Sequence, residues 1–233
     1  MRKPGKVLRA CFAAALCLLA AAGCTVVKIG KESSAGGDQY ATWTKTGTGF
    51  RADEYVAAVW EKQVLPVYEK EAVDYATVLA ALRADRKASL DKYGLRRETG
   101  APFYVFKVRG TARVVQYDNS SRNGVIRVDV EPADGKADAT LQVGPVVLGT
   151  VIRDSLAFIR FTDVGNQLQF ADLADQLNVR VQKDSVKSLD LPKIVGRRIS
   201  FLGAFRLEET QALEEVIVTP VKIDLLDSDG KKK

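Results

Sequence analysis

The chain has 233 residues, of which 46% are hydrophobic and 27% are charged, a composition typical of a protein with an ordered core. It contains no histidine, which excludes a Ser-His-Asp triad, a Cys-His pair and any histidine metal site. The formal net charge of +6 would fit a nucleic-acid partner, but most of this excess comes from the N-terminus.

Residues 1–23 have the pattern of a secretory signal peptide. Four basic residues precede an uncharged run of about 13 residues, shorter than the ~20 that cross a bilayer as a helix. Without this segment, 31 basic and 29 acidic residues remain, a net charge of +2. We therefore expect no nucleic-acid partner. The four basic residues are Arg2, Lys3, Lys6 and Arg9.

Cys24 follows Ala21, Ala22 and Gly23, a sequence that resembles a bacterial lipobox, although Ala21 stands where leucine is usual. We predict that Cys24 is lipidated, so that the membrane is a partner of the mature chain, which works in the periplasm. Thr25 is not aspartate, which favours the outer membrane over the inner one. The other two cysteines leave with the signal, so the mature chain has no free thiol.

After a predicted tether, residues 24–49, the segment 50–94 has helical periodicity. We expect one helix from about Asp53 that Pro66 ends or kinks, and a second from Asp74 to about Lys92. The charges of "RADRK" are expected to be solvated.

From Phe103 onward the period changes to two, which predicts strands. The first strand has a mid-run Gly110, which indicates a bulge or bend. Two further strands follow, and residues 144–161 are expected to be extended and partly buried. A helix is then predicted from the stripe Phe170, Leu173, Ala174, Leu177 and Val181. Two more strands are predicted after this helix. The first places Ile199, Phe201, Phe205 and Leu207 on one face, and the second places Ile217, Val221, Ile223 and Leu225 on one face.

The order of three strands, a helix and two strands predicts an α+β protein with an OB-like five-stranded Greek-key β-barrel. Its helix lies between strands 3 and 4, and N-terminal helices precede the barrel. The barrel domain is assigned to residues 95–227 and a polar tail to 228–233. A split α+β sheet is the alternative fold.

Several stretches resemble one family of bacterial proteins: "KYGLR", "SRNG", "LQVGPVVLGTVIRDSLAFIRFTDVGNQLQFADLADQLNVR" and "GAFRLEE" with "VIVTPVKI". The family is the predicted periplasmic lipoproteins, domain of unknown function family 2291. The resemblance covers most of the mature chain. It implies an envelope location and genes that commonly lie beside sugar ABC transporter genes, and it supplies no catalytic residues.

The densest polar cluster consists of Arg153, Asp154, Asp163, Asn166 and Gln167, and we call it the 153–167 cluster. Amides, carboxylates and arginine beside aromatic residues suit a sugar-binding cleft. In the structural interpretation, Arg153 forms an ion pair with Asp154 or Asp163 and Asn166 caps the next helix. The structural interpretation is favoured, and the cluster is still the best candidate site.

The function expected is that of a non-enzymatic accessory protein that binds a ligand or a protein partner, and the family resemblance implies a carbohydrate ligand or an ABC transporter component. No cofactor, metal or catalytic residue is expected. The alternative is a carboxylate-dependent hydrolase of envelope glycans that uses Asp154 and Asp163. A third class is a purely structural envelope protein.

Overall fold

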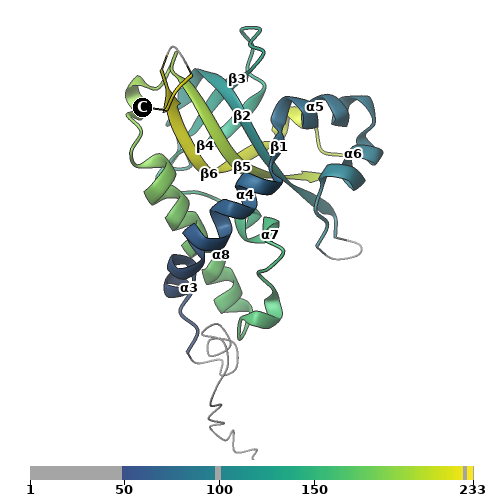
Figure 1. Ribbon diagram of the computed structural model, residues 1–233, viewed down its shortest axis with the longest axis vertical. Coiled ribbons are helices and arrows are strands. Elements are labelled where there is room, and N and C mark those ends of the chain that lie inside the picture. The colour runs from purple at the N-terminus through teal and green to yellow at the C-terminus, as the bar shows by residue number, and fades with distance from the viewer. Residues whose placement is uncertain (1–48, 98–100, 228–229, 233) are drawn as a thin grey trace, which may run out of the picture. The chain divides into compact units, whose positions relative to one another are not determined.

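The computed structural model describes residues 49–97, 101–227 and 230–232, all within one compact unit of the chain (Figure 1). The predictions of a signal peptide, a lipidated Cys24 and a tether concern residues outside the described ones. The strands are β1 (Val73–Asp74), β2 (Phe103–Asp118), β3 (Val125–Val130), β4 (Ala139–Gln142), β5 (Arg198–Glu208) and β6 (Ile217–Leu226).

Five strands pair in the order β2-β3-β4-β6-β5, and β5 pairs again with β2, so the sheet closes into a ring. The closing ladder runs from the pair Phe103 and Glu208 to the pair Arg113 and Arg198. Within the ring only β4 and β6 are parallel, and helices α7 (Val151–Ser155) and α8 (Gln167–Val181) lie between β4 and β5. This is the strand order of an OB barrel, as the sequence predicted.

The interior of the ring is filled by alternate residues of its strands, because successive side chains of a strand point to opposite faces. Phe106 and Phe205 stack there at 4.8 Å between ring centroids. The predicted face of β5 is confirmed, and the inward residues of β2 are buried likewise. The buried residues of these strands include Tyr104, Phe106, Val108, Ala112, Val114, Ile199, Phe201, Phe205 and Leu207.

Gly110 does not form the bulge that the sequence suggested. The ladder between β2 and β5 runs without a break through Gly110 and Phe201, and the irregularity of β2 lies between Val114 and Gln116. A Cβ atom on Gly110 would lie 2.8 Å from two ring atoms of Phe201. The glycine therefore provides space for this ring.

The predicted face of β6 is wrong in its first half. The register shifts between Leu202 and Gly203, which pair with Lys222 and Pro220, so Val221 is an extra residue in β6. Pro220, which has no backbone N–H for the ladder, lies beside this β-bulge. Because of the bulge, Val218 rather than Ile217 packs in the barrel, and Val221 packs on the opposite face.

The first helical segment is continuous and does not end near Pro66. Helix α3 (Ala52–Val59) passes through a π-helical turn (Trp60–Val64) into α4 (Leu65–Glu71). Pro66 lies at the start of α4, where its missing N–H costs little, because the π turn already changes the hydrogen-bond pattern.

The second predicted helix is two helices, α5 (Tyr75–Ala84) and α6 (Arg86–Tyr93). Asp74 caps α5, and Asp85 interrupts the helix by capping α6. Arg86 is not simply solvated, since it donates to the carbonyl oxygens of Glu208, Glu209 and Gln211.

Residues 144–161 are not extended throughout, because they contain α7 and the start of a 3₁₀ turn (Phe161–Asp163). Arg97 binds three carbonyl oxygens of this segment, those of Arg153, Leu156 and Ile159. The apolar residues here follow no strand period because they anchor a compact loop.

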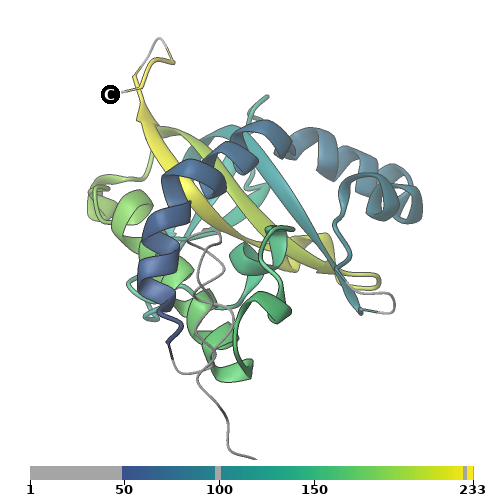
Figure 2. The ribbon, with the colours of Figure 1, turned by 60° about the horizontal axis from the view of Figure 1, so that its bottom comes forward.

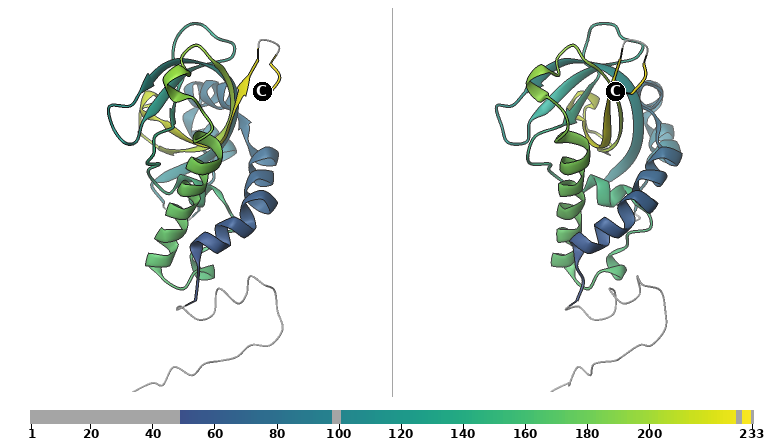
Figure 3. Two further views of the ribbon diagram at one scale, coloured as in Figure 1. Left: turned by 90° about the vertical axis from the view of Figure 1, so that its left-hand side faces the viewer. Right: turned by 60° about the vertical axis from the view of Figure 1, so that its left-hand side comes forward.

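Helices α3, α4, α7 and α8 pack together against the outer face of β2, β5 and β6, as Figures 2 and 3 show. The stripe of α8 is confirmed: Leu173, Ala174, Leu177 and Val181 are buried. This second core includes Val105, Ala204 and Val221 of the barrel wall. The helices leave uncovered the part of this outer face that lies around Thr111 of β2 and Ser200 of β5.

Candidate functional site

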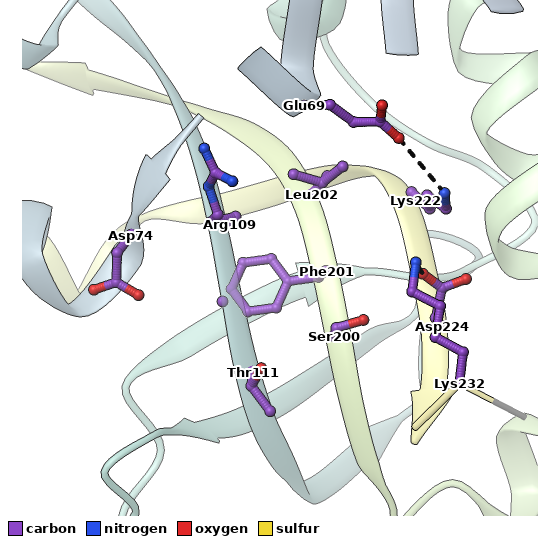
Figure 4. A pocket seen from close by; sticks show the side chains of 11 residues that line it. Glu69, Asp74, Arg109, Thr111, Ser200, Phe201, Leu202, Lys222, Asp224 and Lys232 are labelled. Carbon is purple, nitrogen blue, oxygen red and sulfur yellow. Dashed lines mark ion pairs between the residues drawn. The ribbon is translucent and has the colours of Figure 1, made fainter. Parts of the chain in front are cut away.

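The uncovered part of the wall forms an open pocket of about 350 Å³ (Figure 4). Outward-facing residues of three strands make its floor, in two rows of directly paired residues that we call the grid. One row is Arg109, Leu202 and Lys222, and the other is Thr111, Ser200 and Asp224.

The grid follows from strand geometry. The inward neighbours of its residues, such as Phe201 and Ile223, fill the barrel, so the alternate polar residues must face outward. Adjacent strands lie about 4.8 Å apart, so the three columns of the grid span about 10 Å.

Charged side chains on the pocket rim are paired across different elements. Lys222 Nζ lies 3.8 Å from Glu69 Oε1 of α4, and Lys232 Nζ lies 2.8 Å from Asp224 Oδ2. The hydrogen bond to Asp224 raises the pKa of Lys232. Lys232 therefore remains positively charged and fixes the Asp224 carboxylate at the edge of the grid.

Arg109 is held by the segment that follows α4. Its Nε donates to the carbonyl oxygen of Ala72 at 2.7 Å, and its Nη2 donates to the same oxygen. Asp74 Oδ1 accepts from the backbone N–H and the hydroxyl of Thr77. The pocket thus contains three cationic and three carboxylate side chains, which offer donors and acceptors without a large net charge.

The 153–167 cluster lies elsewhere, around α7 and the start of α8. Arg153 Nη2 pairs with Asp154 Oδ1 at 2.7 Å, and Thr150 Oγ1 donates to Asp154 Oδ2 at 2.6 Å. Arg153 Nη1 donates to the carbonyl oxygen of Phe170, and its guanidinium lies 3.9 Å from the centre of that ring. Arg153 and Asp154 are thus brought together as an ion pair.

The other three residues of the cluster do not join that pair. Asp163 Oδ2 accepts from the backbone N–H of Arg160. Asn166 caps α8 by accepting from the backbone N–H of Gln169 at 3.0 Å, and Gln167 is exposed. These contacts correspond to the structural interpretation of the cluster, and a ligand-binding role for it stays a prediction.

Sequence reasoning missed the grid because its residues come from segments 109–111, 200–202 and 222–224. Segments 109–111 and 222–224 are polar at alternate positions and 200–202 has only Ser200, which in isolation indicates no more than a solvated strand face. The signal that could have found it was the OB strand order, which places the first, fourth and fifth strands side by side.

The sequence profile of a protein family described as predicted periplasmic lipoprotein (DUF2291) matches residues 14–224. The chain belongs to this family. The predicted resemblance is thereby confirmed, and with it a periplasmic, envelope-anchored class of protein.

A crystal structure of an OB-fold protein from Thermotoga maritima is similar to this lipoprotein, with a TM-score of 0.63 and 18% sequence identity. The similarity covers 76% of this chain and 99% of that chain. At this identity it supports the OB fold alone. No curated protein matches the sequence.

Within the described residues, no helix is both long and apolar enough to cross a bilayer. The same part of the chain contains no group of three or more cysteine, aspartate or glutamate side chains placed to hold a metal ion.

Proposed function

We propose that this lipoprotein is a non-enzymatic binding protein, held at the envelope by a lipid on Cys24, and that the grid binds a neutral, sugar-sized ligand. The observation that carries the proposal is the pair of rows on the barrel wall, Arg109–Leu202–Lys222 and Thr111–Ser200–Asp224. It also fits an accessory role in carbohydrate uptake, which the family resemblance implies.

Charge balance supports a neutral polyhydroxyl ligand over an anion or a cation. Lys222 and Asp224 each have an opposite charge beside them, so neither favours a ligand of the other sign. Hydroxyl groups donate and accept, and the grid supplies both kinds of partner through Arg109, Thr111 and Ser200. Leu202 offers an apolar patch for C–H groups.

The contacts of Asp154 and Asp163 support binding over hydrolysis. A glycosidase needs one carboxyl group that can donate a proton and a second that is free to act as base or nucleophile. Both oxygens of Asp154 already have protein partners, and Asp163 binds a backbone N–H. Glycan-cleaving activity that disappears in Asp154→Asn would instead support the hydrolase.

The binding role is tested by calorimetric titration of the mature chain carrying Cys24→Ser with a panel of neutral mono- and disaccharides. We expect at least one saturable ligand, with affinity reduced about tenfold in Ser200→Ala through the loss of one hydrogen bond. Ser188→Ala, an exposed serine outside the pocket, is the matched control. Absence of binding across the panel, or equal effects of both variants, would contradict the proposal.

The anchor and the partner have separate tests. Cys24→Ser should release the protein from the membrane fraction or leave it unprocessed. Crosslinking in cells, followed by mass spectrometry, should recover components of a sugar transporter. Retention of the processed variant in the membrane would refute the anchor, and a crosslink pattern without transporter components would refute the partner.

A further inference from the structure

Two large apolar side chains are exposed at one end of the domain. Leu168, the second residue of α8, is 82% exposed, and Phe161, in the preceding 3₁₀ turn, is 47% exposed. We call these two residues the apolar tip. Leucine and phenylalanine side chains lower their free energy when they leave water for an apolar phase.

Polar residues of the 153–167 cluster hold this tip in place. Phe161 packs edge-on against Phe170 at 5.4 Å between ring centroids, and Arg153 covers another part of Phe170. Asn166 fixes the start of α8 immediately before Leu168. The exposure of the tip is therefore built by specific contacts. This gives the cluster a structural purpose.

The apolar tip lies at the end of the domain where the chain from Cys24 enters. Helices α3 and α8 begin at the same end of the domain (Figures 1 and 3), and Phe50, the second residue of the described chain, packs in one core with Val164. Only 24 residues separate Cys24 from Gly49. The chain that leads from the anchor therefore enters the domain at the end that exposes Phe161 and Leu168.

We propose that the apolar tip inserts into the interfacial layer of the membrane that holds the lipid anchor. The anchor makes this contact intramolecular, so a surface of two side chains is sufficient to orient the domain. Exposed Arg160, half-buried Asp163 and exposed Asp172, one turn after Leu168 on α8, give no excess of positive charge, so the contact depends on apolar insertion rather than on anionic lipids.

This orientation has a consequence for the grid. Helix α3 rises from the tip end, and Glu69 on the pocket rim lies 17 residues after Ala52, about 25 Å along the helical segment. The pocket would then stand clear of the lipid headgroups and open toward the periplasm. The inference rests on the proposed anchor but not on the identity of the ligand.

The test compares two label positions on one helix. Leu168 and Val179 are both exposed on α8 and 11 residues apart, about three turns, so they lie on nearly the same side and about 16 Å apart along the axis. The processed, acylated full chain has no other free thiol, so Leu168→Cys or Val179→Cys takes a single fluorescent label. Each labelled protein is reconstituted into phosphatidylethanolamine–phosphatidylglycerol vesicles that contain a spin-labelled acyl chain as quencher.

We expect at least twofold stronger quenching of the label at position 168 than at position 179, and a loss of this difference when Phe161→Ser is added. Equal quenching at both positions in protein that floats with the vesicles would overturn the inference and leave the anchor intact. Failure to float would overturn the anchor. Emission at position 168 that shifts with protein concentration but not with quencher would show a second copy of the chain covering the tip, which also overturns the inference.

Discussion

Replacing Gly110 with alanine tests the account of the barrel wall beneath the grid. Two ring atoms of Phe201 lie 2.8 Å from the position of the new Cβ, so the ring must move by about 0.6 Å to reach 3.4 Å, where ordinary contact begins. Overpacking of this kind costs about 1 to 3 kcal/mol. Alanine regains about 0.5 to 1 kcal/mol through the smaller entropy of the unfolded chain. The middle values of these two ranges give an expected net loss of about 1 kcal/mol in the free energy of unfolding.

The assay is urea denaturation followed by circular dichroism, in a double-mutant cycle with Phe201→Leu. Because leucine lacks the ring atoms that clash, Gly110→Ala should cost little in the Phe201→Leu background. If Gly110→Ala is equally destabilising in both backgrounds, the glycine serves the backbone, as a bulge or bend would require, and our reasoning is wrong.

Three further predictions concern the described contacts. Ser155→Ala should lower the free energy of unfolding in urea by about 1 to 3 kcal/mol, because it leaves the buried Tyr68 hydroxyl without its partner at 2.6 Å. Tyr68→Phe should lower it less, because Ser155 still donates to the carbonyl oxygen of Ile152 in that variant. Equal losses of stability in the two variants would contradict this prediction. Burial raises the pKa of Tyr75 to about 12, above the unfolded value of about 10, so the folded state binds more protons than the unfolded state between these pH values. The free energy of unfolding should therefore fall as the pH rises from 10 to 12, and it should fall less steeply in Tyr75→Phe. Identical slopes for the two proteins in urea titrations would refute the assignment. Asn166→Ala should lower stability by about 1 kcal/mol through the lost cap without changing sugar affinity, and a weakened affinity in calorimetry would return the 153–167 cluster to the binding site.

The strand pattern predicted the barrel because its interior accepts only apolar side chains at alternate positions. Phe106 and Val108 therefore reveal the inward face of β2 without any knowledge of its neighbours. The caps at Asp74 and Asn166 were equally visible, since each depends on a side chain and a backbone N–H only three residues away.

Other features depend on contacts between distant segments and could not be predicted in this way. The extra residue Val221 shifts the face of β6, and only the pairing with Leu202 and Gly203 shows where the shift occurs. The role of Gly110 depends on Phe201, 91 residues later in the sequence. The grid itself needs the β2–β5 and β5–β6 registers to bring Thr111, Ser200 and Asp224 into one row.

Mapping of a bound sugar by NMR tests the central claim most directly. The backbone amide signals of the isotope-labelled mature chain carrying Cys24→Ser are followed during titration with the tightest neutral sugar of the panel. Binding at the grid predicts that the shifted signals cluster at residues 109–111, 200–202 and 222–224. Shifts confined to residues 153–167, or no saturable shifts with any sugar of the panel, would contradict it.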